Sequence, residues 1–161
     1  MDKMNKMMRR SLTVVGIVVI VVVFSWLYTT VQLGIARSKG TYPSAEQGML
    51  ARLDKYYMPD REVEILYAGT NSFDGSNPHV WYVIAEVHAS ARVDGSALSH
   101  DGCDSPGSYF LQTKDGNWVY VPEGAFPDLM GFWMGVFDMA GEGQSEPSID
   151  WETDQPSQFC R

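Results

Sequence analysis

The sequence lacks the short motifs by which many enzyme classes are recognised. Its 161 residues contain no glycine-rich phosphate loop, no Gly-x-Ser-x-Gly, no His-Glu-x-x-His and no Cys-x-x-Cys. Phosphate-loop nucleotide hydrolysis, serine-elbow hydrolysis, zinc proteolysis and dithiol redox chemistry are therefore not indicated. No internal repeat is present either. These absences favour a protein that is not an enzyme and that holds neither a cofactor nor a metal.

Charge is missing from one long stretch of the chain, since no charged residue occurs from Leu12 to Ile35. A charged side chain at the centre of a bilayer costs roughly 2.5–3.5 kcal/mol on insertion scales, whereas Val, Ile and Leu favour insertion. About 20 apolar residues rising 1.5 Å each cross the ~30 Å hydrocarbon layer. Residues 11–35 are therefore predicted to form a transmembrane helix.

The flanks of this run predict its orientation. Four basic residues precede it and only Asp2 opposes them, so residues 1–10 are predicted to be a cytoplasmic basic arm: Lys3, Lys6, Arg9 and Arg10. The C-terminal domain then lies outside the cytoplasm. A cleaved signal peptide is the alternative, because Gly34 and Ala36 are small residues of the kind read by signal peptidase. The apolar run exceeds the usual 7–15 residues of a signal peptide, so an uncleaved anchor in the cell membrane is preferred.

Positive charge is scarce beyond the anchor. The chain has 12 basic and 20 acidic residues, and without residues 1–10 there remain 8 basic and 19 acidic ones, a net charge of −11. Nucleic acids are bound through patches of Lys and Arg, so a nucleic-acid partner is excluded. Such a surface keeps a domain soluble and can also attract cations or basic partners.

Cysteine is nearly absent, with only Cys103 and Cys160 in the chain. Cys103 lies in a loop rich in Gly, Asp and Ser, and Cys160 is the penultimate residue. In an oxidising compartment such a pair usually forms a disulfide. Closing a loop of about 58 residues stabilises a fold by about 4 kcal/mol in the chain-entropy model. We therefore predict a Cys103–Cys160 disulfide.

Local patterns predict one α+β domain at residues 43–139, joined to the anchor by a linker at 36–42 and followed by an acidic tail at 140–161. Ser44 with Gln47 forms a capping box that begins a helix ending near Met58. Alternating apolar residues predict four antiparallel strands, at 62–67, 79–93, 108–113 and 118–121. Pro127 begins a second helix that runs to about Met139. This order is typical of an α+β roll of the cystatin-like or nuclear-transport-factor-2-like type.

Two features of the predicted strands are candidate sites. Glu86 and His88 share one face of the strand 79–93, as a general acid/base pair requires; a solvent-exposed strand face explains them equally well. The loop from Asn71 to Pro78 is rich in Asn and Asp, whose oxygens bind calcium, but it lacks the spacing of a calcium loop and is interpreted as a turn. The acidic tail is a weaker candidate for a calcium-responsive segment.

The segment from Phe126 to Phe137 is apolar on every side. A short helix of this kind is usually buried against a sheet, and at about thirteen residues it cannot span a membrane. The alternative is a helix that binds a partner or lies on the membrane surface, with Phe132, Trp133 and Phe137 as the contact residues.

Three segments resemble a family of small, membrane-anchored, uncharacterised proteins of Gram-positive bacteria: 74–85, 106–110 and 121–127. The resemblance implies the same topology and a bacterial source, and it implies no activity or site residue. The leading hypothesis is thus an extracytoplasmic accessory protein that binds an unidentified partner protein or envelope component. The alternative is a roll that binds a small molecule, or acts as a hydrolase or isomerase, through Glu86 and His88.

Overall fold

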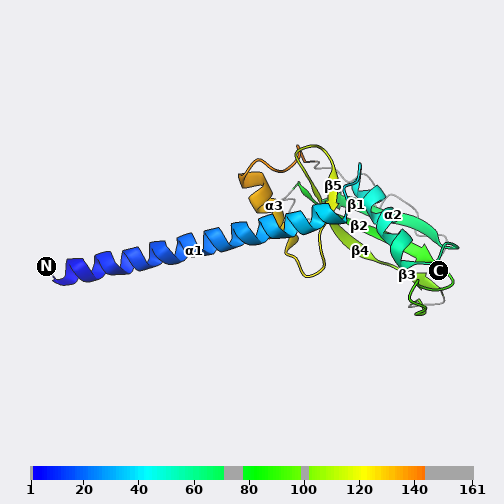
Figure 1. Cartoon of the computed structure of the whole chain (residues 1–161), viewed down its shortest axis with the longest axis horizontal. Coiled ribbons are helices and arrows are strands. Elements are labelled where there is room, and N and C mark those ends of the chain that lie inside the picture. Colours follow the sequence, from blue (N-terminus) through cyan, green and yellow to red (C-terminus); the bar gives the residue numbers. More distant parts are fainter. Residues whose placement is uncertain (1, 71–77, 99–101, 144–161) are drawn as a thin grey trace.

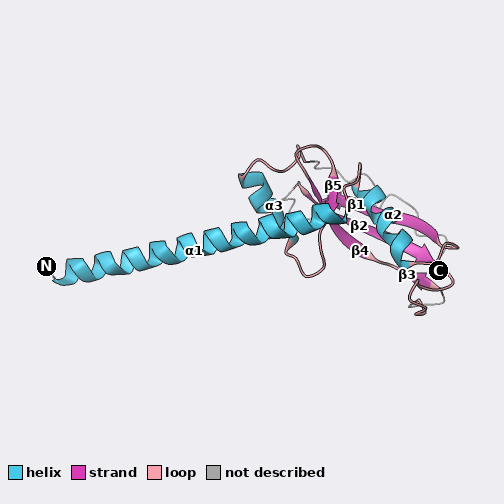
Figure 2. Ribbon diagram, in the orientation of Figure 1, coloured by secondary structure: helices cyan, strands magenta, loops and turns pink. Residues whose placement is uncertain are grey.

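The structure is a computed structural model that describes residues 2–70, 78–98 and 102–143. The predicted calcium or turn loop and most of the predicted acidic tail lie outside the described residues. A long helix projects from a mixed domain of helices and one open antiparallel sheet, as expected for an α+β fold (Figures 1 and 2). The helices are α1 (Asp2–Lys39), α2 (Ala45–Tyr56) and α3 (Pro127–Val136). The strands are β1 (Glu62–Thr70), β2 (Val80–His88), β3 (Cys103–Asp104), β4 (Gly107–Gln112) and β5 (Trp118–Tyr120).

Helix α1 contains the one candidate membrane span among the described residues. From Leu12 to Lys39 it has a mean hydropathy of 2.5 in its most apolar window, and its apolar side chains are exposed along most of this length. Length and composition therefore allow this helix to cross a membrane. Its helical backbone continues without a break through the predicted juxtamembrane residues to Lys39.

Helix α2 begins where the sequence predicts. The backbone N–H of Gln47 donates a hydrogen bond of 3.2 Å to the Ser44 hydroxyl, which caps the helix. Met49 and Leu53 are buried against the sheet, as their spacing of four residues requires. The helix gives way to extended backbone at Tyr57, two residues before Pro59.

The sheet has the order β1-β2-β4-β5 with every neighbouring pair antiparallel, and the short β3 pairs with the end of β2. The predicted strand 79–93 is shorter in the structure, because β2 ends at His88 and Arg92 instead forms an isolated bridge with Tyr57. The strand β3 was not predicted. With two residues, it is too short to show an alternating pattern.

The alternation of apolar residues in β1 does not place them all on one face. Val63, Ile65 and Tyr67 alternate in sequence, but the register shifts between Ile65 and Tyr67. Ile65 therefore pairs with Ala85 on the α2 side, whereas Tyr67 pairs with Ile84 on the opposite side. A β-bulge at this point moves the later residues to the other face.

The sheet separates two hydrophobic cores. The first lies between α2 and the sheet and includes Met49, Leu53, Trp81, Val83 and Phe110. The second lies on the other face, where α3 and the C-terminal part of α1 pack on the sheet; its members include Leu33, Ala36, Leu111, Val119, Met130 and Met134. Figure 1 shows α3 beside α1, on the side of the sheet that faces the N-terminus. The sheet therefore connects α2 with the helix that contains the candidate membrane span.

The close approach of α2 to the sheet depends on Gly48. A Cβ atom at this position would lie 2.5 Å from Cε1 of the fully buried Phe110 ring. Overpacking of a core costs about 1–3 kcal/mol, more than the ~1 kcal/mol that Ala gains over Gly in a helix. We therefore expect Gly48→Ala to lower the free energy of unfolding by about 1–2 kcal/mol. The measurement is urea unfolding of the full chain in detergent micelles, followed by tryptophan fluorescence.

Gly135 in α3 provides the matched control, because an added Cβ would meet no atom within 4 Å. Gly135→Ala should leave the stability unchanged or raise it through helix propensity alone. Equal effects of the two substitutions would contradict the close contact of α2 with Phe110.

Candidate functional site

Helix α3 has one buried side and one exposed side. Met130 and Met134 are fully buried in the second core. On the other side, and at the residues directly before and after the helix, four large apolar side chains remain 45–64% exposed: Phe126, Phe132, Val136 and Phe137. One side of α3 is thus a core side, and the alternative of an interaction helix stays a prediction for its exposed side. We call these four side chains the exposed α3 face.

Of the three predicted partner-binding residues, Phe132 and Phe137 belong to the exposed α3 face and Trp133 lies beneath it. Trp133 is only 9% exposed, and its ring stacks on Phe137 at 5.5 Å between centroids. The ring of Phe132 meets Trp133 edge-on at 5.2 Å. Trp133 therefore positions the two exposed rings.

The C-terminal half of α1 holds α3 in place. The Trp26 and Phe137 rings lie 6.1 Å apart between centroids, and Tyr28 contacts Phe126 in the same way at 6.0 Å. The backbone N–H of Phe126 also donates a hydrogen bond of 3.1 Å to the Tyr28 hydroxyl. These contacts join residues about one hundred positions apart. Sequence patterns report local periodicity, so they could not reveal this pairing.

Glu86 and His88 lie two residues apart on β2, so they share a sheet face as predicted. Glu86 is buried and His88 is exposed, and no hydrogen bond or ion pair joins them in the part of the chain that the structure describes. Their role as an acid/base pair stays a prediction. The strand register adds neighbours that the sequence did not indicate, because Glu62 pairs with His88 and Glu64 pairs with Glu86.

Residues 2–70, 78–98 and 102–143 contain no group of three His, Cys, Asp or Glu side chains that could hold a metal ion. Nδ1 of His88 lies 3.5 Å from Sγ of Cys103. Cys160 lies outside the described residues, so the predicted disulfide stays a prediction.

Among the cavities formed by the described residues, two involve residues of the sheet and of α2. One of about 500 Å³ lies beside His88, between the end of β2 and the loop that precedes β1; it is lined by Asp60, Glu62, His88, Ala89, Ser90 and Gly102. The other, of about 360 Å³, lies at the start of α2 and is lined in part by Trp81 and Trp118, whose rings are 4.9 Å apart between centroids. The indole N–H of Trp81 is buried and has no hydrogen-bond partner among the described atoms. The sequence indicated neither cavity, since each is assembled from distant segments.

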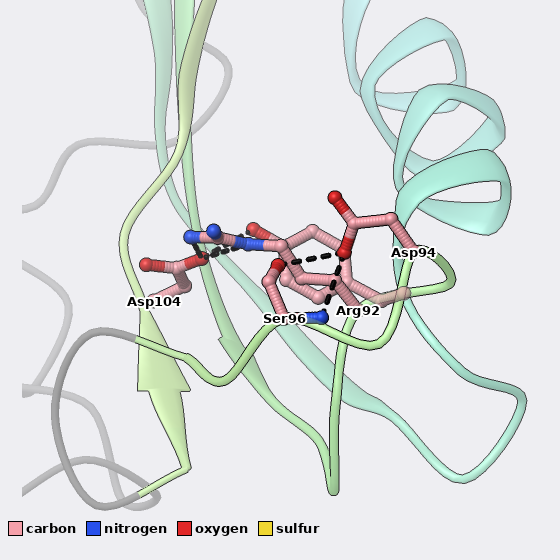
Figure 3. A network of polar contacts seen from close by, with 5 residues as sticks. Arg92, Asp94, Ser96 and Asp104 are labelled. Atoms are coloured by element: carbon pink, nitrogen blue, oxygen red, sulfur yellow. Dashed lines mark hydrogen bonds and ion pairs between the residues drawn. The ribbon is translucent and has the colours of Figure 1, made fainter.

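A polar network fixes the end of α2 to the sheet (Figure 3). The Tyr57 hydroxyl donates a hydrogen bond of 2.8 Å to Oδ2 of Asp104, and Nε of Arg92 donates one of 3.1 Å to the same oxygen. Burial, followed by the hydrogen bond to Asp104, raises the pKa of Tyr57 from 10.0 to about 12. The hydrogen bond from Arg92 to Asp104 raises the pKa of that guanidinium further.

The turn that carries Arg92 has its own support. Asp94 accepts hydrogen bonds from the hydroxyl and the backbone N–H of Ser96, at 2.6 and 2.9 Å, and these bonds lower the pKa of the Asp94 carboxyl. Figure 3 shows this turn beside the Arg92–Asp104 contact. The network supports α2 and β3, and it gives the loop after β2 a structural role.

Comparison with known proteins identifies no relative. No protein-family model matches the chain, and neither a curated protein nor a solved structure is similar to it.

We expect the Tyr57 hydroxyl to stabilise the fold in a pH-dependent manner. Since the pKa of Tyr57 is higher in the folded state, its neutral form is the favoured one; the stabilisation is complete below pH 10.0 and is lost as the pH rises towards about 12. Tyr57→Phe should lower the free energy of unfolding by about 1–2 kcal/mol at pH 7. It should also weaken the alkaline loss of stability, measured by urea unfolding at pH 7 to 12.

Tyr56→Phe is the control, because its exposed ring lies one residue away and the network consists of Tyr57, Asp104 and Arg92. If the two variants show the same alkaline dependence, the assignment of the network to Tyr57 is wrong.

Proposed function

We propose that this chain is a single-pass membrane protein whose domain lies outside the cytoplasm and acts as a non-enzymatic accessory protein. It binds a partner protein or envelope component through the exposed α3 face. The observation that carries this proposal is the exposure of four large apolar side chains on a helix whose opposite side belongs to the core. Exposed apolar patches of this kind mark interaction surfaces.

The connection between α1 and the domain supports a retained anchor. Leu33 is 4% exposed and Ala36 is fully buried, and both belong to the second core. Thr29, one turn before Leu33, is also fully buried. Cleavage after Ala36 would remove all three side chains, together with Tyr28, from contacts that position α3. We therefore propose that the helix stays attached, with its basic N-terminal arm in the cytoplasm.

The rest of the domain fits an accessory role. We propose that α2 on the antiparallel sheet forms a roll of the cystatin-like or nuclear-transport-factor-2-like type, tied at its end by the Cys103–Cys160 disulfide. The net charge of −11 outside the arm makes a basic partner surface or a neutral envelope component more favourable than an anionic one. No nucleic acid, cofactor or metal is part of the proposal.

The test is photocrosslinking in living cells, with the photoreactive residue benzoyl-phenylalanine incorporated in place of Phe132. We expect a crosslinked product, because the 57% exposed ring would lie against the bound component. The matched control carries the same group at Leu50 on α2, which is 41% exposed and belongs to the opposite side of the sheet. The readout is the intact mass of the purified chain. If position 132 gives no product, or no more product than position 50, the proposed role of the α3 face is wrong.

A second candidate function is the binding of a small cationic molecule near His88. The observation that favours it is the cavity of about 500 Å³ bordered by Asp60, Glu62 and His88, on the sheet face that also carries Glu86. Two carboxylates beside one imidazole suit a positively charged ligand.

This candidate predicts that an amine from a metabolite panel raises the melting temperature of the purified chain. Glu62→Gln should abolish the shift, and Glu86→Gln should abolish it only if the ligand also reaches that carboxylate. Asp128→Asn, on α3, is the control that should leave the shift unchanged. The candidate is refuted if no amine in the panel stabilises the wild-type chain.

A further inference from the structure

The position of the exposed α3 face along α1 is fixed by contacts. Phe137 meets Trp26, and Phe126 meets Tyr28 through its ring and its backbone N–H. The height of α3 relative to a membrane therefore follows from the height of Trp26 and Tyr28.

That height can be bracketed from both ends of the uncharged run. With a rise of 1.5 Å per residue, Trp26 lies about 21 Å above Leu12. It also lies about 14 Å below Ile35 by the same rise. The hydrocarbon layer is ~30 Å thick. If its inner boundary lies at Leu12, or at a residue after Leu12, Trp26 lies in the outer half of the layer or closer to its middle. Helix α3, held against Trp26, then lies at the level of the outer leaflet.

The chemistry of α3 suits this level. Its exposed side chains are three phenylalanines and one valine, and one of them, Phe137, meets Trp26 of α1, which is itself 39% exposed. Charged groups flank the patch: Asp128 lies in the first turn of α3, and Asp138 pairs with Lys114 just beyond the last turn. An apolar face bordered by charge is typical of a helix that lies in the interface plane. With 10 residues, α3 is too short to span.

We propose that the exposed α3 face binds the acyl chains and glycerol region of the outer leaflet. This inference rests on the proposed function and names the envelope component as lipid rather than protein. The four side chains form an apolar surface continuous with that of the transmembrane helix, so α1 and α3 enter the leaflet together. The domain is then held at two points and cannot rotate freely about its anchor.

The test uses the purified full chain in nanodiscs that contain only phosphatidylcholine, whose headgroup carries no net charge. Benzoyl-phenylalanine is placed at Phe132, at Val18 in the middle of α1, or at Leu50 on α2. After irradiation, the intact mass should increase by the mass of one lipid at position 132 and at position 18. It should remain unchanged at position 50. Matching near-ultraviolet circular dichroism of the three variants establishes that each is folded.

The outcomes separate this inference from the proposed function. A lipid adduct at positions 18 and 132, with none at 50, supports the inference. An adduct at position 18 alone overturns it; if position 132 still gives a protein adduct in cells, the proposed function stands and its partner is a protein. If position 132 gives no adduct either in nanodiscs or in cells, both this inference and the proposed function are wrong. An absence of lipid adduct at position 18 shows that α1 does not contact lipid, which also overturns the inference.

Discussion

The structure depends on one helix that has to satisfy two environments. Along most of its length α1 exposes Val, Ile and Leu, side chains of the kind that favour the interior of a bilayer. Near its C-terminal end the same helix buries Thr29, Leu33 and Ala36 in the second core. The candidate membrane span is therefore continuous with a helix segment that belongs to the fold. Helix α3 completes that core with Met130 and Met134. Its contacts with α1 therefore determine where along α1 its exposed surface lies.

The sheet links the packing of α1 and α3 to the packing of α2. Its one face packs on α1 and α3, and its other face packs on α2, so the two cores share β2, β4 and β5. Gly48 allows α2 to approach Phe110 closely, and the Tyr57–Asp104–Arg92 network holds the end of α2 to β3 and to the loop after β2. These contacts join α2, the sheet and the sheet face on which α3 packs into one packed structure. A partner that bound the exposed α3 face would therefore meet a preformed surface.

The cap of α2 shows where sequence reasoning succeeds and the sheet shows where it fails. Ser44 and Gln47 lie three residues apart, so their capping hydrogen bond follows from local geometry. The alternation of β1 gave its position, but the bulge after Ile65 transfers Tyr67 to the other face, because the register of β2 takes precedence over alternation. The strand predicted to reach Val93 ends at His88, since Arg92 is used by a network with two distant residues. For the candidate site, the sequence indicated Phe132 and Phe137, yet it could not separate them from the buried Trp133 on the same short helix.

By itself, the sequence determined the features that depend on composition and short-range spacing. These are the apolar helix from Leu12 onward, the acidic character of the remaining chain, the start of α2 and the mixed α+β class. Only the tertiary structure decided which side of α3 is buried, which α1 residues join the core, and which carboxylates face His88. The physical reason is that burial depends on partners far apart in the chain. Phe126 and Tyr28 illustrate it, since neither residue carries any local sign of the other.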